Sequence, residues 1–178
     1  MKPKEISSQI IFTCPYFKVE QKELLYSNGY KHSYYLEHGI NFASVVAEQN
    51  NKFLMVRQYR VPEGNYTIEF PAGGIGKDEL PEVGAKRELV EETGYVANNL
   101  TFIGLIKPII ARSKVHGSIY YTNDITHNPE LMNLDQSEFG LEAIWVEKEE
   151  LKNLLLNGEI CDSITIASWA FLNLRKII

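Results

Sequence analysis

The sequence predicts an α/β protein in which helices lie on both faces of a mixed central sheet. Strand-like runs occupy the middle of the chain, with helical segments before and after them, which is typical of a helix–sheet–helix sandwich. A β-rich segment comes first and predicts a small antiparallel appendage. At 178 residues the chain is long enough for one full hydrophobic core plus such an appendage. We therefore assign residues 1–39 to the appendage and residues 40–178 to the main domain.

The expected strands are short runs bounded by turn residues. The appendage extends from Ser8 to about Glu37, and Asn28-Gly29 is its clearest turn. A hairpin follows it and turns at Gln49-Asn50-Asn51. The strands expected after the appendage are Asn41–Ala47, Lys52–Tyr59, Thr67–Phe70, Leu100–Leu105, Ser118–Tyr121 and Leu141–Val146.

Three helices are expected. The first spans Pro81–Thr93, because proline suits the first turn of a helix and Gly94 suits the left-handed residue just past its end. The other two lie near the C-terminus, at Lys148–Leu155 and Ser163–Arg175.

Composition limits the classes of partner. The formal net charge of −5 argues against a nucleic-acid partner, because such binding needs a basic surface. It does not argue against a phosphorylated substrate, since a bound metal can reverse the sign of the local charge.

The N-terminus lacks a signal-peptide core and the chain lacks a stretch that could span a membrane. Cys14 and Cys161 belong to no CxxC pair, so we expect a cytoplasmic protein with reduced thiols.

The helix expected at Pro81–Thr93 carries an acidic face. On a helical wheel the apolar residues fall on one broad side, which we expect to face the core: Val83, Ala85, Leu89 and Val90. The charged residues gather opposite them: Arg87, Glu88, Glu91 and Glu92. Like charges four residues apart destabilise a bare helix by a few tenths of a kcal/mol, whereas Mg²⁺ prefers clustered carboxylates. Gly84 is expected to leave room above this face for ions and a diphosphate. A solvated surface helix is the alternative interpretation of the charge pattern alone.

The spacing of these residues identifies a family. Gly73, Glu79, Arg87-Glu88-Leu89, Glu91-Glu92 and Gly94-Tyr95 together fit the pattern GX5EX7REUXEEXGU, where U is a bulky apolar or aromatic residue. So many fixed positions make a chance match improbable, and the chain resembles the Nudix hydrolase superfamily. Gln58-Tyr59-Arg60, followed by Ile68-Glu69-Phe70-Pro71-Ala72-Gly73, resembles its ADP-ribose and ADP-sugar pyrophosphatase branch. The resemblance implies the Nudix α/β/α sandwich.

The resemblance implies a metal site at this motif. The main-chain carbonyl of Ala72 and the carboxylates of Glu88 and Glu92 would hold the metals, and Glu91 would lie close enough to share one. The implied cofactor is Mg²⁺, for which Mn²⁺ can substitute.

Other residues take supporting or catalytic roles by the same resemblance. Gly73 would let the loop turn without a side-chain clash, and Glu79 and Arg87 would help to orient the ligand carboxylates. Arg87, whose fork suits either a carboxylate or a phosphate, is counted with Glu91 among the catalytic residues. Glu138 would position or deprotonate the attacking water; Asp135 is the alternative for that role.

Substrate contacts are implied for three residues: Arg60, Glu69 and Arg112. Arg60 would grip the substrate near its phosphates or terminal ribose; a solvated residue at a strand end is the alternative. Tyr34 and Tyr35 either stack on a nucleobase or cover a core edge or a dimer seam.

Two places depart from the family pattern. Leu80 stands where a Ser or Thr usually caps the helix, so Asp78 is expected to supply the cap. The loop Ala111-Arg112-Ser113-Lys114 replaces a Ser/Asp-Pro-Gly loop, and its two cations suggest a more anionic ligand.

The implied reaction is substitution at phosphorus by water. The expected substrate is ADP-ribose, cleaved to AMP and ribose 5-phosphate. Three alternatives stay open: another nucleotide sugar or a dinucleotide, a nucleoside triphosphate, and an ADP-ribose sensor that does not cut. All the carboxylates of the GX5EX7REUXEEXGU motif are present, which favours catalysis. Members of this branch are commonly homodimers, and we expect one here.

Overall fold

The computed structural model describes residues 2–178, apart from the side chain of Ser137. The chain divides into two compact units. The first is the segment that ends at Asn41 together with Lys107–His116, and the second is Phe42–Ile106 with Gly117–Ile178. In the described part of the chain, no helix is both long and apolar enough to cross a membrane.

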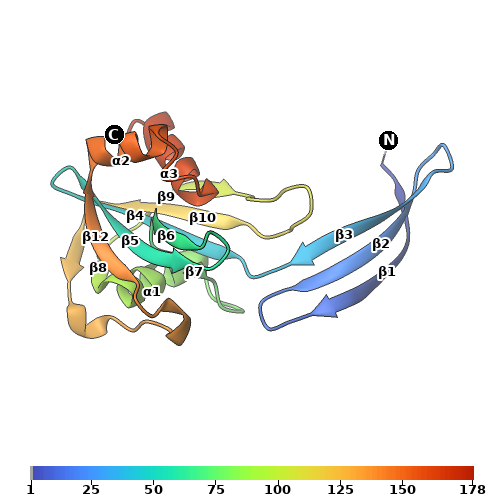
Figure 1. Cartoon of the computed structure of the whole chain (residues 1–178), viewed down its shortest axis with the longest axis horizontal. Helices are drawn as coiled ribbons and strands as arrows, with labels where there is room; N and C mark the ends of the chain where they lie inside the picture. Colours follow the sequence, from blue (N-terminus) through green and yellow to red (C-terminus); the bar gives the residue numbers. More distant parts are fainter. Residues whose placement is uncertain (1) are drawn as a thin grey trace. The chain divides into compact units, whose positions relative to one another are not determined.

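The first unit is an antiparallel meander of three strands, shown in blue in Figure 1. Its strands are β1 (Lys4–Thr13), β2 (Lys18–Leu25) and β3 (Lys31–His38). The turn between β2 and β3 contains Gly29 with a φ of 82°, as the Asn-Gly signal predicts. Residues 107–116 join the meander through a bridge between Glu37 and Ser113. The appendage is therefore a meander stabilised by a distant loop, which its local sequence does not indicate.

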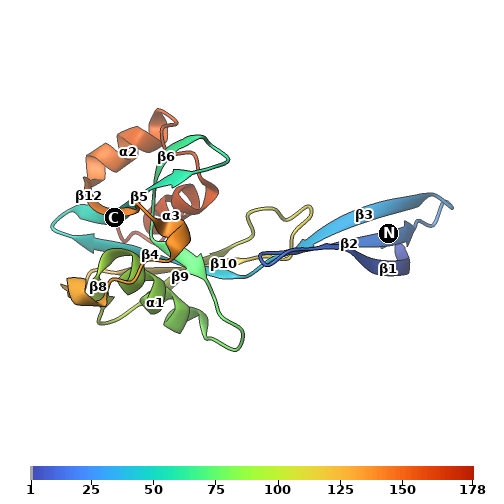
Figure 2. The same ribbon diagram turned by 60° about the horizontal axis from the view of Figure 1, so that its bottom comes forward.

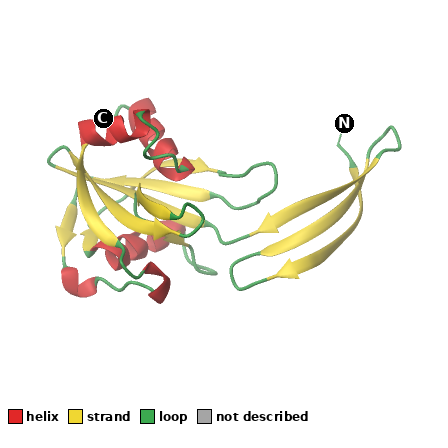
Figure 3. Ribbon diagram, viewed as in Figure 1, coloured by secondary structure: helices red, strands yellow, loops and turns green. Residues whose placement is uncertain are grey.

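The second unit is built on a mixed sheet of seven strands (Figure 3). Its main path runs β12-β5-β4-β10-β9, with β6 paired to β5 and β7 paired to β4. The pairing of β10 with β4 is parallel, and the other pairings are antiparallel. The strands are β4 (Phe42–Gln49), β5 (Lys52–Arg60), β6 (Asn65–Glu69), β7 (Ala72–Gly74), β9 (Thr101–Ile106), β10 (Gly117–Thr122) and β12 (Glu142–Glu147).

Helices cover both faces of this sheet (Figure 2). On one face, α2 (Lys148–Leu156) and α3 (Ser163–Leu174) pack through Leu151 and Leu172 against Phe53 and Met55. On the other face, α1 (Pro81–Thr93) packs through Ala85 and Leu89 against the strand residues whose side chains point to that side of the sheet. Successive residues of β4 and β5 therefore point alternately to the two faces and contribute to both cores. The α/β/α prediction is confirmed.

The predicted elements are present within one or two residues of their expected ends in most cases. Helix α1 has the predicted bounds, and Gly94 ends it with a φ of 71°. Three elements were not predicted as strands: β7, β8 (Tyr95–Ala97) and β11 (Ile125–His127). Each has only three residues, and β8 pairs with β11 in a separate two-stranded ribbon. Runs this short carry too few alternations to be detected.

Three expectations about α1 are wrong. Val83 is 53% exposed, whereas Glu92, which the helical wheel places among the charged residues, is only 4% exposed. Gly84 is buried against Glu79 and Ile75: a Cβ there would lie 3.1 Å from a Glu79 carboxylate oxygen, so the glycine gives room to the chain itself. The N-cap is Leu80, and no described side chain caps the helix. Asp78 instead adopts a φ of 68°, which makes the turn before it.

Candidate metal and diphosphate site

Three carboxylates converge beside the N-terminal loop of α1. Glu88 and Glu92 come from adjacent turns of α1, and Glu138 ends a short 3-10 turn (Gln136–Glu138) ahead of β12. One carboxylate oxygen from each lies within 4.8 Å of the other two. Oxygens at this separation can share one hard divalent cation. The predicted ligands Glu88 and Glu92 are thus brought together, and the residue predicted to handle water lies beside them.

Glu92 is the most deeply placed of the three. Only 4% of it is exposed, and one of its oxygens accepts a hydrogen bond of 3.2 Å from the backbone N–H of Ala72. Burial raises the pKa of Glu92 well above its ordinary value, and the carboxylates of Glu138 and Glu88 raise it further. A buried acid flanked by two other acids is costly without compensating positive charge. The donor set therefore fits a divalent cation.

Burial also raises the pKa of Glu88, although the guanidinium of Arg87 opposes this effect. The adjacent backbone must come very close to that carboxylate. A Cβ placed on Gly73 would lie 2.1 Å from the carboxyl carbon of Glu88. Any side chain at Gly73 would consequently displace the carboxylate of Glu88, which explains why the motif begins with glycine.

Arg87 holds the carboxylates in place. Its Nε and Nη2 donate to the two oxygens of Glu79 at 3.0 and 3.1 Å. Its Nη1 donates to Glu88 at 2.7 Å and to Glu91 at 2.9 Å, and its Nη2 also donates to the carbonyl of Gly74 at 2.7 Å. These bonds use all five N–H groups of the guanidinium. Arg87 is therefore placed to orient carboxylates rather than to bind a phosphate.

Glu79 completes this support. A hydrogen bond from the backbone of Gly76, 2.7 Å long, ties its carboxylate to the loop. The guanidinium of Arg87 lowers the pKa of Glu79, and the Gly76 bond lowers it further. Glu79 is thus held as an anion between the loop and Arg87, as the predicted orienting role requires.

Two other acids near the cluster have different partners. The carboxylate of Glu91 is turned to Arg87 and lies outside the three-carboxylate group. The side chain of Asp135 accepts a hydrogen bond from the backbone of Glu138, and the Glu138 side chain accepts one of 2.8 Å from the backbone of Asp135. This reciprocal pair makes Asp135 a support for Glu138.

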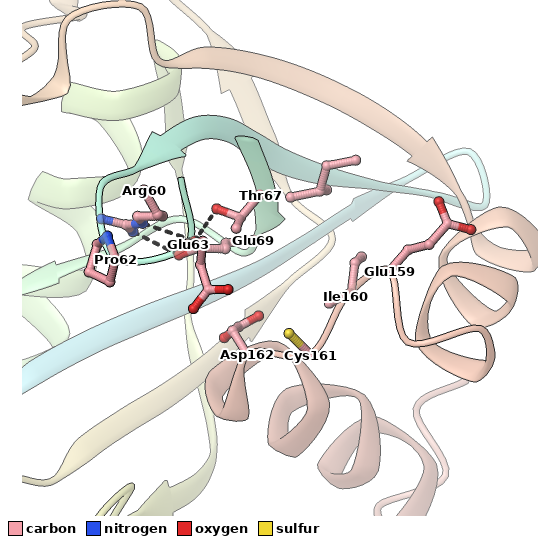
Figure 4. A pocket seen from close by; sticks show the side chains of 10 residues that line it. Arg60, Pro62, Glu63, Thr67, Glu69, Glu159, Ile160, Cys161 and Asp162 are labelled. Carbon is pink, nitrogen blue, oxygen red and sulfur yellow. Dashed lines mark hydrogen bonds and ion pairs between the residues drawn. The ribbon is translucent and has the colours of Figure 1, made fainter. Parts of the chain in front are cut away.

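Arg60, the last residue of β5, and Glu69, the last residue of β6, form a two-pronged ion pair. Nε and Nη2 of Arg60 donate to the two oxygens of Glu69 at 2.9 and 2.7 Å, and Thr67 donates to Glu69 at 2.5 Å. Burial acts to raise the pKa of Glu69, but the bonds from Arg60 and Thr67 outweigh it, and the pKa is lowered. The pair is the expected substrate-binding element, and it lines a cavity of about 290 Å³ (Figure 4).

Arg112 lies in the other compact unit. Its backbone carbonyl accepts a hydrogen bond of 2.7 Å from the N–H of Glu37, so it belongs to the loop that joins the meander. Its contact with substrate stays a prediction.

The far wall of the cavity, formed by Glu159–Asp162, was not predicted from the sequence. Spacing could not reveal it, because this segment follows Glu69 by about ninety residues and carries no motif of its own. The only local signal was Asp162 at the start of α3, where it caps the helix.

Comparisons with known proteins agree with this geometry. The family model of the NUDIX domain matches residues 37–165. An ADP-ribose pyrophosphatase from Bacillus subtilis is 34% identical over 136 residues, which cover 75% of this chain and 72% of that protein. A methanol dehydrogenase activator from Bacillus methanolicus is 29% identical over 176 residues, covering 97% and 94% of the two chains.

A solved structure shows the same fold. The crystal structure of an ADP compounds hydrolase superposes with a TM-score of 0.82 at 22% identity, and the match covers 97% of this chain and 93% of the other. The predicted resemblance is confirmed by the family match, which spans well over half of the sequence and includes all three converging carboxylates. The chain belongs to the NUDIX domain family and is a Nudix hydrolase.

Proposed function

We propose that this enzyme hydrolyses the diphosphate bond of ADP-ribose to give AMP and ribose 5-phosphate. The observation that carries the proposal is the convergence of Glu88, Glu92 and Glu138 with Glu92 almost fully buried. Such a site suits a divalent cation and, through it, the oxygens of a diphosphate. The named activities of the Bacillus subtilis protein and of the solved structure support an ADP derivative as substrate.

The proposed metal ligands are Glu88, Glu92 and the carbonyl of Ala72. Mg²⁺, or Mn²⁺ in its place, supplies neutralisation of the diphosphate charge. Glu138 accepts a proton from the attacking water or orients that water. Arg87 and Glu79 keep Glu88 in position, since Arg87 is bonded to both.

The choice among substrates is tested with a panel of nucleoside diphosphate sugars, dinucleotides and nucleoside triphosphates, each with Mg²⁺ and with Mn²⁺. We expect the highest kcat/KM for ADP-ribose. A higher kcat/KM for a GDP-sugar or a dinucleotide would support hydrolysis of a diphosphate bond but contradict ADP-ribose as the substrate. A higher kcat/KM for a nucleoside triphosphate would contradict both the proposed reaction and the proposed substrate.

Arg60→Ala is expected to raise KM for ADP-ribose more than it lowers kcat, because contact with an unreacting part of the substrate is lost. Arg57→Ala is the matched control, since Arg57 lies on the same strand and stacks at 4.0 Å on the ring of Tyr66. Steady-state kinetics on both variants, with thermal melts to confirm folding, make the comparison. An unchanged KM in Arg60→Ala would remove Arg60 from the substrate site.

We further propose that residues 1–39 mediate a homodimer and help to cover the substrate. The meander leaves large apolar side chains exposed, among them Ile10 at 54% and Phe12 at 50%. A second copy of the chain would remove this surface from water. Light scattering should give about twice the monomer mass of 20.4 kDa, and a monomer at micromolar concentration would contradict the proposal.

In the described chain both cysteines are free thiols, which suits the proposed cytoplasmic location.

A further inference from the structure

The segment between β6 and β7 carries the chain from one neighbouring strand to another. β6, which ends at Glu69, pairs with β5, and β7, which begins at Ala72, pairs with β4. Phe70 and Pro71 lie between the two strands and belong to neither ladder, and we call this pair of residues the joint. Ala72, whose carbonyl is a proposed metal ligand, follows the joint directly.

The joint has a single backbone N–H, that of Phe70, because proline has none. Phe70 is 1% exposed, so its N–H needs a partner within the protein. It donates to the hydroxyl of Thr165 in the first turn of α3, with 3.3 Å between the nitrogen and the oxygen. The carbonyl of Pro71 accepts a bond of 3.0 Å from the N–H of Val45. The joint is thus held by β4 through its carbonyl and by α3 through its N–H.

The hydroxyl of Thr165 serves the joint and not its own helix. Thr165 is the third residue of α3, and its backbone N–H is already capped by the carboxylate of Asp162 at 2.9 Å. A glutamate or glutamine at this position of a helix often bonds back to the cap residue, whereas Thr165 bonds to the joint. Thr165 is 0% exposed and is branched at Cβ, which restricts rotation of its side chain. Its hydroxyl is therefore an acceptor held in a fixed place.

The residue after the joint is tied to the proposed metal site. The N–H of Ala72 donates to Glu92 of α1 at 3.2 Å. The peptide units between Phe70 and Ala72 are planar, and the ring of Pro71 fixes its φ. A displacement of Phe70 is consequently passed on to Ala72, and hence to the carbonyl proposed to bind the metal.

We propose that Thr165 is a positioning residue for the metal site: its hydroxyl fixes the joint and thereby the carbonyl of Ala72. The inference rests on the proposed function, in which that carbonyl binds Mg²⁺. Without the hydroxyl, the buried N–H of Phe70 loses its partner, and the cost of ordering the joint falls on metal binding.

Thr165→Val and Thr165→Ser distinguish this role from a packing role. Valine keeps the branched shape and removes the hydroxyl, whereas serine keeps the hydroxyl and removes a buried methyl group. Positioning predicts that Thr165→Val raises the Kd for Mg²⁺ by about threefold to tenfold and that Thr165→Ser leaves it within about twofold of the wild-type value. Packing alone predicts the reverse order, because serine leaves a small cavity and valine does not. Calorimetric titration measures both Kd values without turnover.

Ser168→Ala is the matched control. Ser168 lies in the next turn of α3, is 0% exposed, and has a hydroxyl with no hydrogen-bond partner among the described residues. Its replacement removes a buried hydroxyl from the same helix without removing a bond to the joint. Ser168→Ala should leave the Kd for Mg²⁺ and kcat/KM for ADP-ribose unchanged. Weakening of Mg²⁺ binding equal to that in Thr165→Val would contradict a specific role for Thr165.

The outcomes separate this inference from the proposed function. If the wild-type enzyme binds no Mg²⁺ and cleaves no ADP-ribose, the proposed function fails and the inference fails with it. If the wild-type enzyme binds Mg²⁺, and Thr165→Val binds it at least as tightly as Thr165→Ser does, only the role assigned to Thr165 fails.

A measurement on the unaltered protein keeps the inference testable if Thr165→Val does not fold. Backbone amide resonances are followed by proton–nitrogen NMR while Mg²⁺ is added. The amides of Phe70 and Thr165 should shift over the same range of Mg²⁺ concentration as the amide of Ala72, because a metal at Ala72 alters the bond that links the joint to α3. A Thr165 amide that stays still while the Ala72 amide shifts would overturn the inference.

Discussion

Glu92→Gln is expected to lower kcat by on the order of 10²-fold or more, about 3 kcal/mol of activation free energy. Glutamine keeps the shape of the side chain, and its carbonyl oxygen can still accept the hydrogen bond from Ala72. The variant loses only the charge that faces the proposed cation. Mg²⁺ affinity, measured by calorimetric titration, should fall together with kcat.

The variant should also fold normally without metal. Glu92 is buried beside Glu88 and Glu138, so removing its charge relieves repulsion. Glu82→Gln is the matched control, because Glu82 lies on the same helix, is exposed and pairs with Lys86 at 3.3 Å. Full activity of Glu92→Gln would contradict the metal site itself.

Glu138→Gln is expected to lower kcat by about 10²–10⁴-fold while KM stays unchanged. A residue that handles only the attacking water contributes to the transition state and little to binding of the substrate. The glutamine oxygen can still accept the bond from the backbone of Asp135, so the loop should keep its shape.

Titration with Mg²⁺ separates the two possible roles of Glu138. One of its oxygens lies within 4.8 Å of an oxygen of Glu88 and of an oxygen of Glu92, so it can act on water or as a further ligand. Unchanged Mg²⁺ affinity with low kcat indicates the first role, and weakened affinity indicates the second. Full activity would assign the water to another group, and Asp135 would be the next residue to replace.

Local signals were sufficient to predict most of the fold and the proximity of Glu88 and Glu92. Helix α1 begins at a proline and ends before a glycine, and both preferences act within one turn of the chain. The spacing of Glu88 and Glu92 places two carboxylates together on any helix, whatever surrounds it.

The features that were not predicted depend on tertiary contacts. Glu92 is buried and accepts a hydrogen bond from the backbone of Ala72, while Val83 is exposed, and a helical wheel contains neither of these facts. The far wall of the cavity is brought to Arg60 only when α3 packs beside β6, and the bond between Phe70 and Thr165 records that packing. Pairwise spacing in the sequence contains no information about these contacts.

Metal removal tests the central claim most directly. ADP-ribose is incubated with enzyme that has been treated with EDTA and freed of chelator, and the products are followed by phosphorus NMR before and after Mg²⁺ is added. We predict negligible turnover without metal, because the clustered carboxylates would repel the diphosphate, and formation of AMP and ribose 5-phosphate once Mg²⁺ is present. Undiminished hydrolysis in the metal-free enzyme, or no hydrolysis after Mg²⁺ and Mn²⁺ have both been supplied, would contradict this account.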